Sequence, residues 1–206
     1  MKNIKRFITI EGIDGCGKSV QAEILSEWLS HKFGKNNVVK TFEPGGFGNE
    51  IRNILLNSSM CARSELLLFL ADRIEHVRNV ILPSMSDSKW IVCERYIDST
   101  LVYQASGRGI PVSEVERLFS WCEFPVPQLT IYLDVPVDVA VSRVNARGNK
   151  DRIESAGIDF IGRISQAYKQ LAQSRKRIVS VDASLGVKEV ADCIRNILEE
   201  RFELKG

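Results

Sequence analysis

The sequence predicts one α/β domain with a parallel sheet flanked by helices, and three observations predict it. The 206 residues are enough for one domain with a full hydrophobic core. Short apolar runs alternate with amphipathic stretches along the chain, which is typical of βαβ units rather than of a sandwich or a helical bundle. No repeat or linker interrupts this alternation. We therefore expect residues 1–206 to form a single domain.

The individual elements follow from hydrophobic periodicity. The expected strands are short apolar runs, near residues 5–11, 38–42, 89–93, 128–134 and 177–181. Between them, apolar residues recur at three- and four-residue spacing, the period of a helix, in residues 18–33, 61–82, 111–122, 136–147, 158–173 and 187–203. The polar stretch from Gly148 to Gly157 follows neither pattern, and we expect it to be a mobile loop or lid.

Composition excludes several classes of function. The chain is 44% hydrophobic and 26% charged with a net charge of +2, so it has no broad basic surface for nucleic acid. The longest apolar run, Leu66 to Ala71, is too short to span a bilayer, and no export signal is visible. We therefore expect a cytoplasmic protein that binds neither nucleic acid nor a membrane.

The cysteines do not form a metal-binding or disulfide pattern. They lack a Cys-x-x-Cys pair and metal-like spacing to His31 and His76. We expect reduced, buried thiols at all positions, which are Cys16, Cys61, Cys93, Cys122 and Cys193.

A phosphate-binding loop follows the first expected strand and precedes the first expected helix. Its sequence is Gly12-Ile13-Asp14-Gly15-Cys16-Gly17-Lys18-Ser19, and we assign the nucleotide site to these residues and Val20. Backbone N–H groups of the glycines can wrap phosphates, Lys18 reaches the transferring phosphate, and the Ser19 hydroxyl can ligate Mg²⁺. A coincidental glycine-rich turn is the alternative, and the strand-to-helix context argues against it. The loop predicts ATP binding but does not separate a kinase from a GTPase or a motor.

Three further segments resemble the thymidylate kinase family, in the expected order and spacing. They are Phe42-Glu43-Pro44-Gly45-Gly46, then Glu94-Arg95-Tyr96-Ile97-Asp98-Ser99-Thr100 continuing to Tyr103-Gln104, and Asp151-Arg152-Ile153-Glu154. The resemblance implies a P-loop nucleoside-monophosphate kinase fold with a parallel five-stranded sheet and a small lid. It also implies Mg²⁺-ATP as donor, dTMP as acceptor, dTDP as product in dTTP synthesis, and a homodimer.

Some positions depart from the family pattern. The family usually has Asp at Glu94, Thr at Val20 and Phe47, and Gly at Ala105. Gly15 stands where one branch of the family has a basic residue. The resemblance therefore points to the other, bacterial-type branch, in which the lid supplies the arginines.

The acceptor phosphate is already anionic, so the reaction needs cations and positioning rather than a general base. Arg95 ends the third expected strand, at the edge where open α/β sheets bind ligands, and it resembles the arginine that bridges the two phosphates. By resemblance, Glu94 lies near Mg²⁺ and Asp14 accepts the sugar 3′-hydroxyl. The alternatives are a surface ion pair for Arg95, a helix N-terminal charge for Glu94 and an Asx turn for Asp14.

Two residues of the second expected helix form a candidate thymine site. Phe69 and Arg73 are four apart and share one helical face. By resemblance, Phe69 stacks on thymine and Arg73 donates to its O4, although the surrounding apolar run read alone is ordinary core. Glu43 and Pro44 belong to the substrate site by resemblance, and Arg52 is assigned to the acceptor phosphate, with a solvated helix face as its alternative.

Four residues after Arg95 are spaced as helical neighbours, 99 with 103 and 100 with 104. By resemblance, Thr100 and Gln104 address the base, while Ser99 and Tyr103 line the sugar-phosphate side. Ser99 could equally be a helix N-cap.

Three arginines bracket the expected lid. Arg143 resembles the arginine that stacks on adenine, and Arg147 and Arg152 resemble cations that close on the donor phosphates. A solvated, arginine-rich helix end is the alternative. A closing lid would also exclude water, which matters because ATP hydrolysis competes with transfer.

Two other functions remain in competition. A different nucleoside-monophosphate or deoxynucleoside kinase would share the scaffold and differ in base recognition. A GTP-dependent switch would require a guanine-reading Asn-Lys-x-Asp segment, and the sequence contains none.

Overall fold

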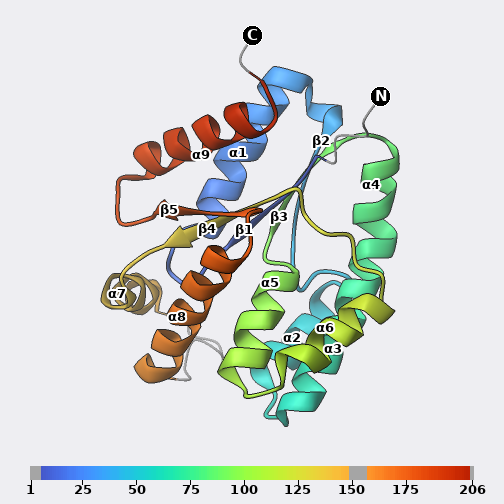
Figure 1. Ribbon diagram of the computed structural model, residues 1–206, viewed down its shortest axis with the longest axis vertical. Helices are drawn as coiled ribbons and strands as arrows, with labels where there is room; N and C mark the ends of the chain where they lie inside the picture. Colours follow the sequence, from blue (N-terminus) through green and yellow to red (C-terminus); the bar gives the residue numbers. More distant parts are fainter. Residues whose placement is uncertain (1–5, 149–156, 205–206) are drawn as a thin grey trace.

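Five parallel strands form the centre of the molecule, as the alternating pattern predicts (Figure 1). The computed structural model describes residues 6–148 and 157–204. The strand order is β2-β3-β1-β4-β5. The bounds are β1 (Phe7–Glu11), β2 (Val38–Phe42), β3 (Trp90–Glu94), β4 (Leu129–Asp134) and β5 (Ile178–Asp182). All five predicted strands are confirmed.

Helices cover both faces of the sheet. On one face, α1 (Lys18–Phe33) packs beside α9 (Val187–Arg201), and on the other lies α8 (Ile158–Ser174), as Figure 1 shows. The remaining segments are η1 (Lys35–Asn37), α2 (Asn49–Asn57), α3 (Ala62–His76), η2 (Val77–Ile81), α4 (Leu82–Ser86), α5 (Ile97–Thr100), η3 (Leu101–Gly107), α6 (Val112–Trp121) and α7 (Val137–Arg147).

The helix predicted over 61–82 extends to Ser86 and is not uniform. Its middle part, η2, is π-helical and leads directly into α4, which has Pro83 in its first turn. Proline has no N–H to donate and its ring crowds the preceding turn, and a wider π-helical turn accommodates both effects. The helix α2 was not among the predicted helices, because it is short and buries only Leu55.

Alternation along β1 decides which side chains face the functional site. Ile8 and Ile10 belong to the core that α1 covers, whereas Phe7 packs in the core on the opposite face. Thr9 and Glu11 share the face of Phe7, because successive strand residues point to opposite sides. Thr9 pairs in register with Thr130 of β4, and their hydroxyl oxygens lie 2.7 Å apart. Polar groups are therefore built into the sheet face that leads to the P-loop.

The prediction that every cysteine is buried is wrong. Cys16 and Cys93 are buried, Cys122 is half-buried, and Cys61 and Cys193 are exposed, all with free thiols. Cys61 precedes α3 at the surface, and Cys193 lies on the outer face of α9. No helix of the described segments has the length and apolarity to cross a membrane.

Candidate active site

The P-loop connects β1 to α1 and holds its own lysine. Gly17 is left-handed, with φ 97°, and α1 begins at Lys18. The Lys18 ammonium donates to the Ile13 carbonyl at 2.9 Å and lies 3.6 Å from the Asp14 carboxylate. Ser19 is exposed on the first turn of the helix. The loop thus presents a cation, a hydroxyl and a helix N-terminus at one place, which suits a phosphate chain.

Arg95 lies between the P-loop and the helical segment after β3. Its guanidinium forms an ion pair with Asp14 and stacks 5.2 Å from the centre of the Tyr103 ring. Tyr103 donates its hydroxyl to the other oxygen of Asp14 at 3.3 Å. Burial opposes ionisation of Asp14, but the charges of Arg95 and Lys18 outweigh it and hold its pKa well below the usual range. The Arg95 side chain is only 16% exposed, so this is not the surface ion pair considered as the alternative.

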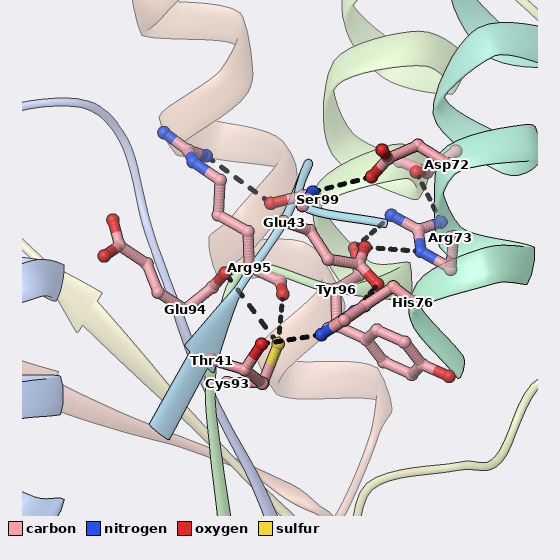
Figure 2. A network of polar contacts seen from close by, with 12 residues as sticks. Thr41, Glu43, Asp72, Arg73, His76, Cys93, Glu94, Arg95, Tyr96 and Ser99 are labelled. Atoms are coloured by element: carbon pink, nitrogen blue, oxygen red, sulfur yellow. Dashed lines mark hydrogen bonds and ion pairs between the residues drawn. The ribbon is translucent and has the colours of Figure 1, made fainter. Parts of the chain in front are cut away.

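The backbone of Arg95 is strained. Its φ is 65°, in the left-handed region that residues with a β-carbon rarely adopt. The Arg95 N–H donates to the Ile10 carbonyl, and the Cys93 thiol donates to the Arg95 carbonyl at 3.0 Å. Such strain is typical of functional sites that neighbouring contacts hold in place. In Figure 2 the Glu94 carboxylate points to the other side from the cluster around Glu43.

Glu11 is a buried acid that sequence analysis missed. Its carboxylate accepts the Tyr96 N–H at 2.7 Å, the Ser99 hydroxyl at 2.6 Å and the Tyr168 hydroxyl at 2.8 Å. Burial, and then the negative charge of Asp98, raise the pKa of Glu11 to about 7. The alternation of β1 could have revealed it, because Glu11 follows Thr9 onto an inner face. Ser99 is inside α5 and bonded to Glu11, so its N-cap alternative is wrong.

A second buried cluster holds Arg73 (Figure 2). Its guanidinium donates to Glu43 at 2.6 Å, to the Thr100 hydroxyl at 2.9 Å and to the Tyr96 carbonyl at 3.0 Å. His76 lies 2.9 Å from the other Glu43 oxygen. Arg73 is 2% exposed and remains charged: burial disfavours its ionised form, but Glu43 outweighs this and raises its pKa. Among the described residues, three of its five N–H groups have hydrogen-bond partners, and the other two have none there.

The loop between β2 and α2 is fixed by α3. Asp72 accepts the Gly45 N–H at 2.7 Å and the Phe47 N–H at 2.9 Å. A β-carbon on Gly46 would lie 1.9 Å from the Asp72 carbonyl oxygen, so only glycine fits there. The Glu43–Pro44 peptide bond preceding this loop is cis.

Arg52 reaches back from α2 to the same loop. It donates to the Pro44 carbonyl at 3.4 Å and lies over the Phe42 ring at 5.4 Å. These contacts place Arg52 beside the loop rather than on the solvated outer face of α2.

Gln104 and Phe69 complete the candidate base site. Gln104 is buried and donates its side-chain amide to Glu65 at 2.9 Å. Phe69 is half-buried on the same face of α3 as Arg73 and Glu65. The structure therefore gathers the base-site candidates along α3 and the α5–η3 segment.

The donor-side arginines are placed only in part. Arg143 donates to the Gly15 carbonyl at 3.4 Å and to the Ala183 carbonyl at 3.3 Å, so it lies over the P-loop. The Arg147 side chain and all of Arg152 lie outside the described residues.

The metal candidates Ser19 and Glu94 do not form a protein cage. The described residues contain no cluster of three or more His, Cys, Asp or Glu side chains that could hold a metal ion. Mg²⁺ generally binds through one or two protein ligands together with substrate phosphates, so this sparse set fits a magnesium-nucleotide complex.

The family model named Thymidylate kinase matches residues 10–194. The chain belongs to the thymidylate kinase family. Thymidylate kinase of Neisseria meningitidis serogroup A is 37% identical over 203 residues, which are 96% of this chain and 98% of the relative. Thymidylate kinase of Ruthia magnifica is 40% identical over 202 residues, 94% of this chain and 97% of the relative. A crystal structure of thymidylate kinase from Ehrlichia chaffeensis matches with a TM-score of 0.77 and 33% identity, covering 93% of this chain and 97% of that one.

In this thymidylate kinase family member, the supporting residues are what sequence reasoning missed. Glu11, Glu65, Asp72, His76 and Tyr168 are buried or nearly so and hold the candidates predicted from motifs. Hydrophobic periodicity gave no signal for Glu65 and Asp72 on α3, because it marks apolar positions only. Their bonds to Gln104, Arg108, Gly45 and Phe47 span 25 or more residues of sequence.

Proposed function

We propose that this protein transfers the γ-phosphoryl group of ATP to dTMP, which yields dTDP for dTTP synthesis. The observation that carries the proposal is the position of Arg95, whose guanidinium is anchored on P-loop Asp14 and on Tyr103 of η3. One cation thus touches both the donor loop and the segment assigned to the acceptor. A thymidylate kinase needs such a charge between two phosphate groups that repel each other.

On the donor side, the backbone N–H groups from Gly12 to Ser19 would bind the ATP phosphates, with Val20 at the end of the loop. Lys18 would exchange the Ile13 carbonyl for a phosphate oxygen, since an ammonium binds an anion more strongly than a neutral carbonyl. Ser19 would ligate Mg²⁺, with Glu94 near it, and the metal would neutralise phosphate charge when bound. Arg143, beside Gly15, would cover the adenine.

On the acceptor side, Arg95 would move from Asp14 toward the dTMP phosphate, and Asp14 would accept the 3′-hydroxyl. Arg52 would contact the same phosphate from α2, next to Glu43 and Pro44. Asp14 is ionised at neutral pH because its pKa is depressed, so it can accept this hydrogen bond.

For the base, Phe69 would stack on thymine, and Arg73 would donate to O4 with the N–H groups that its protein partners leave. Thr100 and Gln104 would address the remaining base edge, and Ser99 the sugar-phosphate side. The Tyr103 ring would occupy the space that a ribose 2′-hydroxyl requires.

We also propose that the chain belongs to the branch in which lid arginines, Arg147 and Arg152, stabilise the transferring phosphate. The P-loop geometry supports this assignment. A β-carbon on Gly15 would lie 2.3 Å from the Ala140 carbonyl oxygen, so a basic side chain cannot occupy that position without a shift of α7. The cations would then come from elsewhere, and α7, whose Arg143 contacts the P-loop, leads directly into the segment 148–157.

The remaining proposals concern assembly and location. We take residues 1–206 as one domain in the cytoplasm. Exposed apolar side chains on the adjoining helices α2 and α3, namely Ile54, Leu67 and Ile74, support a homodimer that would cover them.

A coupled assay of ADP release across a panel of acceptors tests the activity. We expect kcat/KM to fall in the order dTMP, dUMP, then UMP and dCMP, and thymidine to be inactive. Cytosine would place an amino donor against Arg73, and UMP would place its 2′-hydroxyl against Tyr103. Equal values for dTMP and dCMP would refute a thymine site, and a preference for another monophosphate would favour a different kinase of the same fold.

A further inference from the structure

The helices that carry the base-site candidates contact each other through two hydrogen bonds between buried side chains. Arg73 of α3 donates to Thr100 of α5 at 2.9 Å, and two turns earlier on α3, Glu65 accepts from Gln104 of η3 at 2.9 Å. As residue numbers fall along α3 they rise along α5–η3, so the two segments are antiparallel at this contact. Phe69 lies midway between Glu65 and Arg73, on the same face of α3.

An ion pair between Glu65 and Arg108 supports the contact between Glu65 and Gln104. Arg108 donates its Nε to one Glu65 oxygen at 3.2 Å and a terminal nitrogen to the other at 3.3 Å. Its guanidinium also lies 4.8 Å from the centre of the Phe160 ring. Glu65 is 1% exposed, whereas Arg108 is 25% exposed and links the buried acid to the surface. This side-by-side arrangement favours the ionised carboxylate.

An ionised carboxylate only accepts hydrogen bonds, and this fixes which way the Gln104 amide points. The NH₂ group of Gln104 must face Glu65, so the amide oxygen faces away from it. Within residues 6–148 and 157–204, no group donates to that oxygen. Gln104 can therefore present this acceptor to a base, as the proposed function requires of it.

We infer that Glu65 is a specificity-determining positioning residue: by holding the Gln104 amide in one orientation, it makes the site accept a pyrimidine N3–H and reject an unprotonated N3. Thymine and uracil carry a hydrogen on N3, whereas N3 of cytosine is an acceptor. Arg73, with donors only, makes the matching choice at position 4. The inference rests on the proposed function, in which Gln104 addresses the base.

The test compares kcat/KM for dTMP, dUMP and dCMP in the wild type and in Glu65→Gln. The amide that replaces Glu65 can donate as well as accept, so Gln104 is free to turn its NH₂ toward the base. We expect the dTMP/dCMP ratio to fall by about tenfold or more, the scale of one mispaired buried hydrogen bond. The dTMP/dUMP ratio should stay unchanged, because both bases present the same N3–H and O4. A fall in both the dTMP/dCMP and the dTMP/dUMP ratio would mean general damage to the pocket and would overturn the inference.

Two further variants separate positioning from bulk stability. Glu116→Gln breaks a Glu–Arg pair with Arg175 on the outer surface of α6 and should leave both ratios as in the wild type. Gln104→Leu should lower the dTMP/dCMP ratio, and adding Glu65→Gln to it should lower the ratio no further, because the inference assigns the effect of Glu65 on this ratio to the Gln104 amide. Additive losses in the double variant would overturn the inference.

If Glu65→Gln does not fold, the side-chain amide can be observed directly by NMR in the wild type, with its resonance assigned from its loss in Gln104→Leu. Of its two protons, we expect the one that faces Glu65 to be protected from exchange both with and without dTMP, because the Gln104 NH₂ group keeps donating to Glu65. Contact of these protons with bound thymine would overturn the inference. A wild type without any preference for dTMP over dCMP would instead refute the proposed thymine site, which keeps the two failures distinct.

Discussion

The acceptor side and the donor side of this site are built differently. On the acceptor side, Arg73, Gln104 and Thr100 are at most 2% exposed and are held by bonds between helices. On the donor side, Lys18 bonds to its own loop, Ser19 and Arg143 are exposed, and Arg152 belongs to the 148–157 segment. In the proposed assignment, base recognition thus depends on packed helices, whereas the phosphate-binding charges lie on loops and at helix ends.

This difference matches the two tasks. A base is discriminated by hydrogen-bonding groups whose direction must not change, and burial among fixed partners secures that direction. Charges on a transferring phosphate are needed only when both substrates are present, so they can come from segments that close on the nucleotide. Breaking the donor side should therefore cost turnover with little loss of stability. Breaking the acceptor side should change selectivity or stability.

The largest effect is expected from the lid. Replacing Arg147 and Arg152 together by alanine should lower kcat by about 10³-fold, the scale of an arginine that stabilises a transferring phosphoryl group. Steady-state ADP release at saturating dTMP measures this, with Arg195→Ala on the surface of α9 as the matched control. Undiminished turnover in the double variant would show that the lid is not the source of the catalytic cations.

Lys18→Ala should lower kcat by about 10²- to 10³-fold, because it removes a preorganised charge from the transferring phosphate. The thermal unfolding midpoint should change little, since the contacts of the Lys18 ammonium with the described residues lie within its own loop. Lys40→Ala, which removes an exposed lysine paired with Glu23, is the control. A folded Lys18→Ala protein with wild-type turnover would contradict the assignment of the donor loop.

Glu11 joins the two sides, because it ends β1 just before the P-loop and bonds to α5. Its pKa rises from 4.5 to about 7 on folding, so between these values the folded protein holds a proton that the unfolded chain has released. The contribution of Glu11 to the free energy of unfolding should therefore be largest below pH 4.5. It should fall as pH rises toward 7, by up to about 3 kcal/mol.

Glu11→Gln should remove this fall, as measured by urea unfolding from pH 5 to 8. Gln cannot ionise, and around it burial raises the pKa of the Tyr168 hydroxyl and, against the effect of burial, the charge of Asp14 raises the pKa of Arg95, both well above that range. Glu116→Gln should retain the wild-type slope, because that acid is exposed. An identical slope in Glu11→Gln would mean that Glu11 stays ionised throughout.

The smallest effect concerns the thymine methyl group. One methyl group in an apolar pocket is worth about 10- to 200-fold in selectivity, so the wild type should prefer dTMP to dUMP within that range. Phe69→Ala should lower the dTMP/dUMP ratio of kcat/KM by about tenfold. The variant should still prefer dTMP to dCMP, because the hydrogen bonds that distinguish thymine from cytosine remain. An unchanged dTMP/dUMP ratio would place the methyl group elsewhere.

The sequence by itself determined the strands, the P-loop and the faces of the base-site helices. These are local properties: alternation sets the strands, glycine spacing sets the loop, and a separation of four places Phe69 and Arg73 on one face. The carboxyl ends of parallel strands meet at one edge, so Arg95 could also be placed near the P-loop before the structure was known.

Only the tertiary structure decided which groups hold these residues in place. Glu11 meets Tyr168, Glu65 meets Gln104 and Glu43 meets Arg73 across 30 or more residues of chain. It also decided that Cys61 and Cys193 are exposed. A buried acid has the same letter as an exposed one, and what distinguishes them is the partner that offsets the cost of removing charge from water. That partner is brought close by the packing of helices on the sheet, which no local pattern encodes.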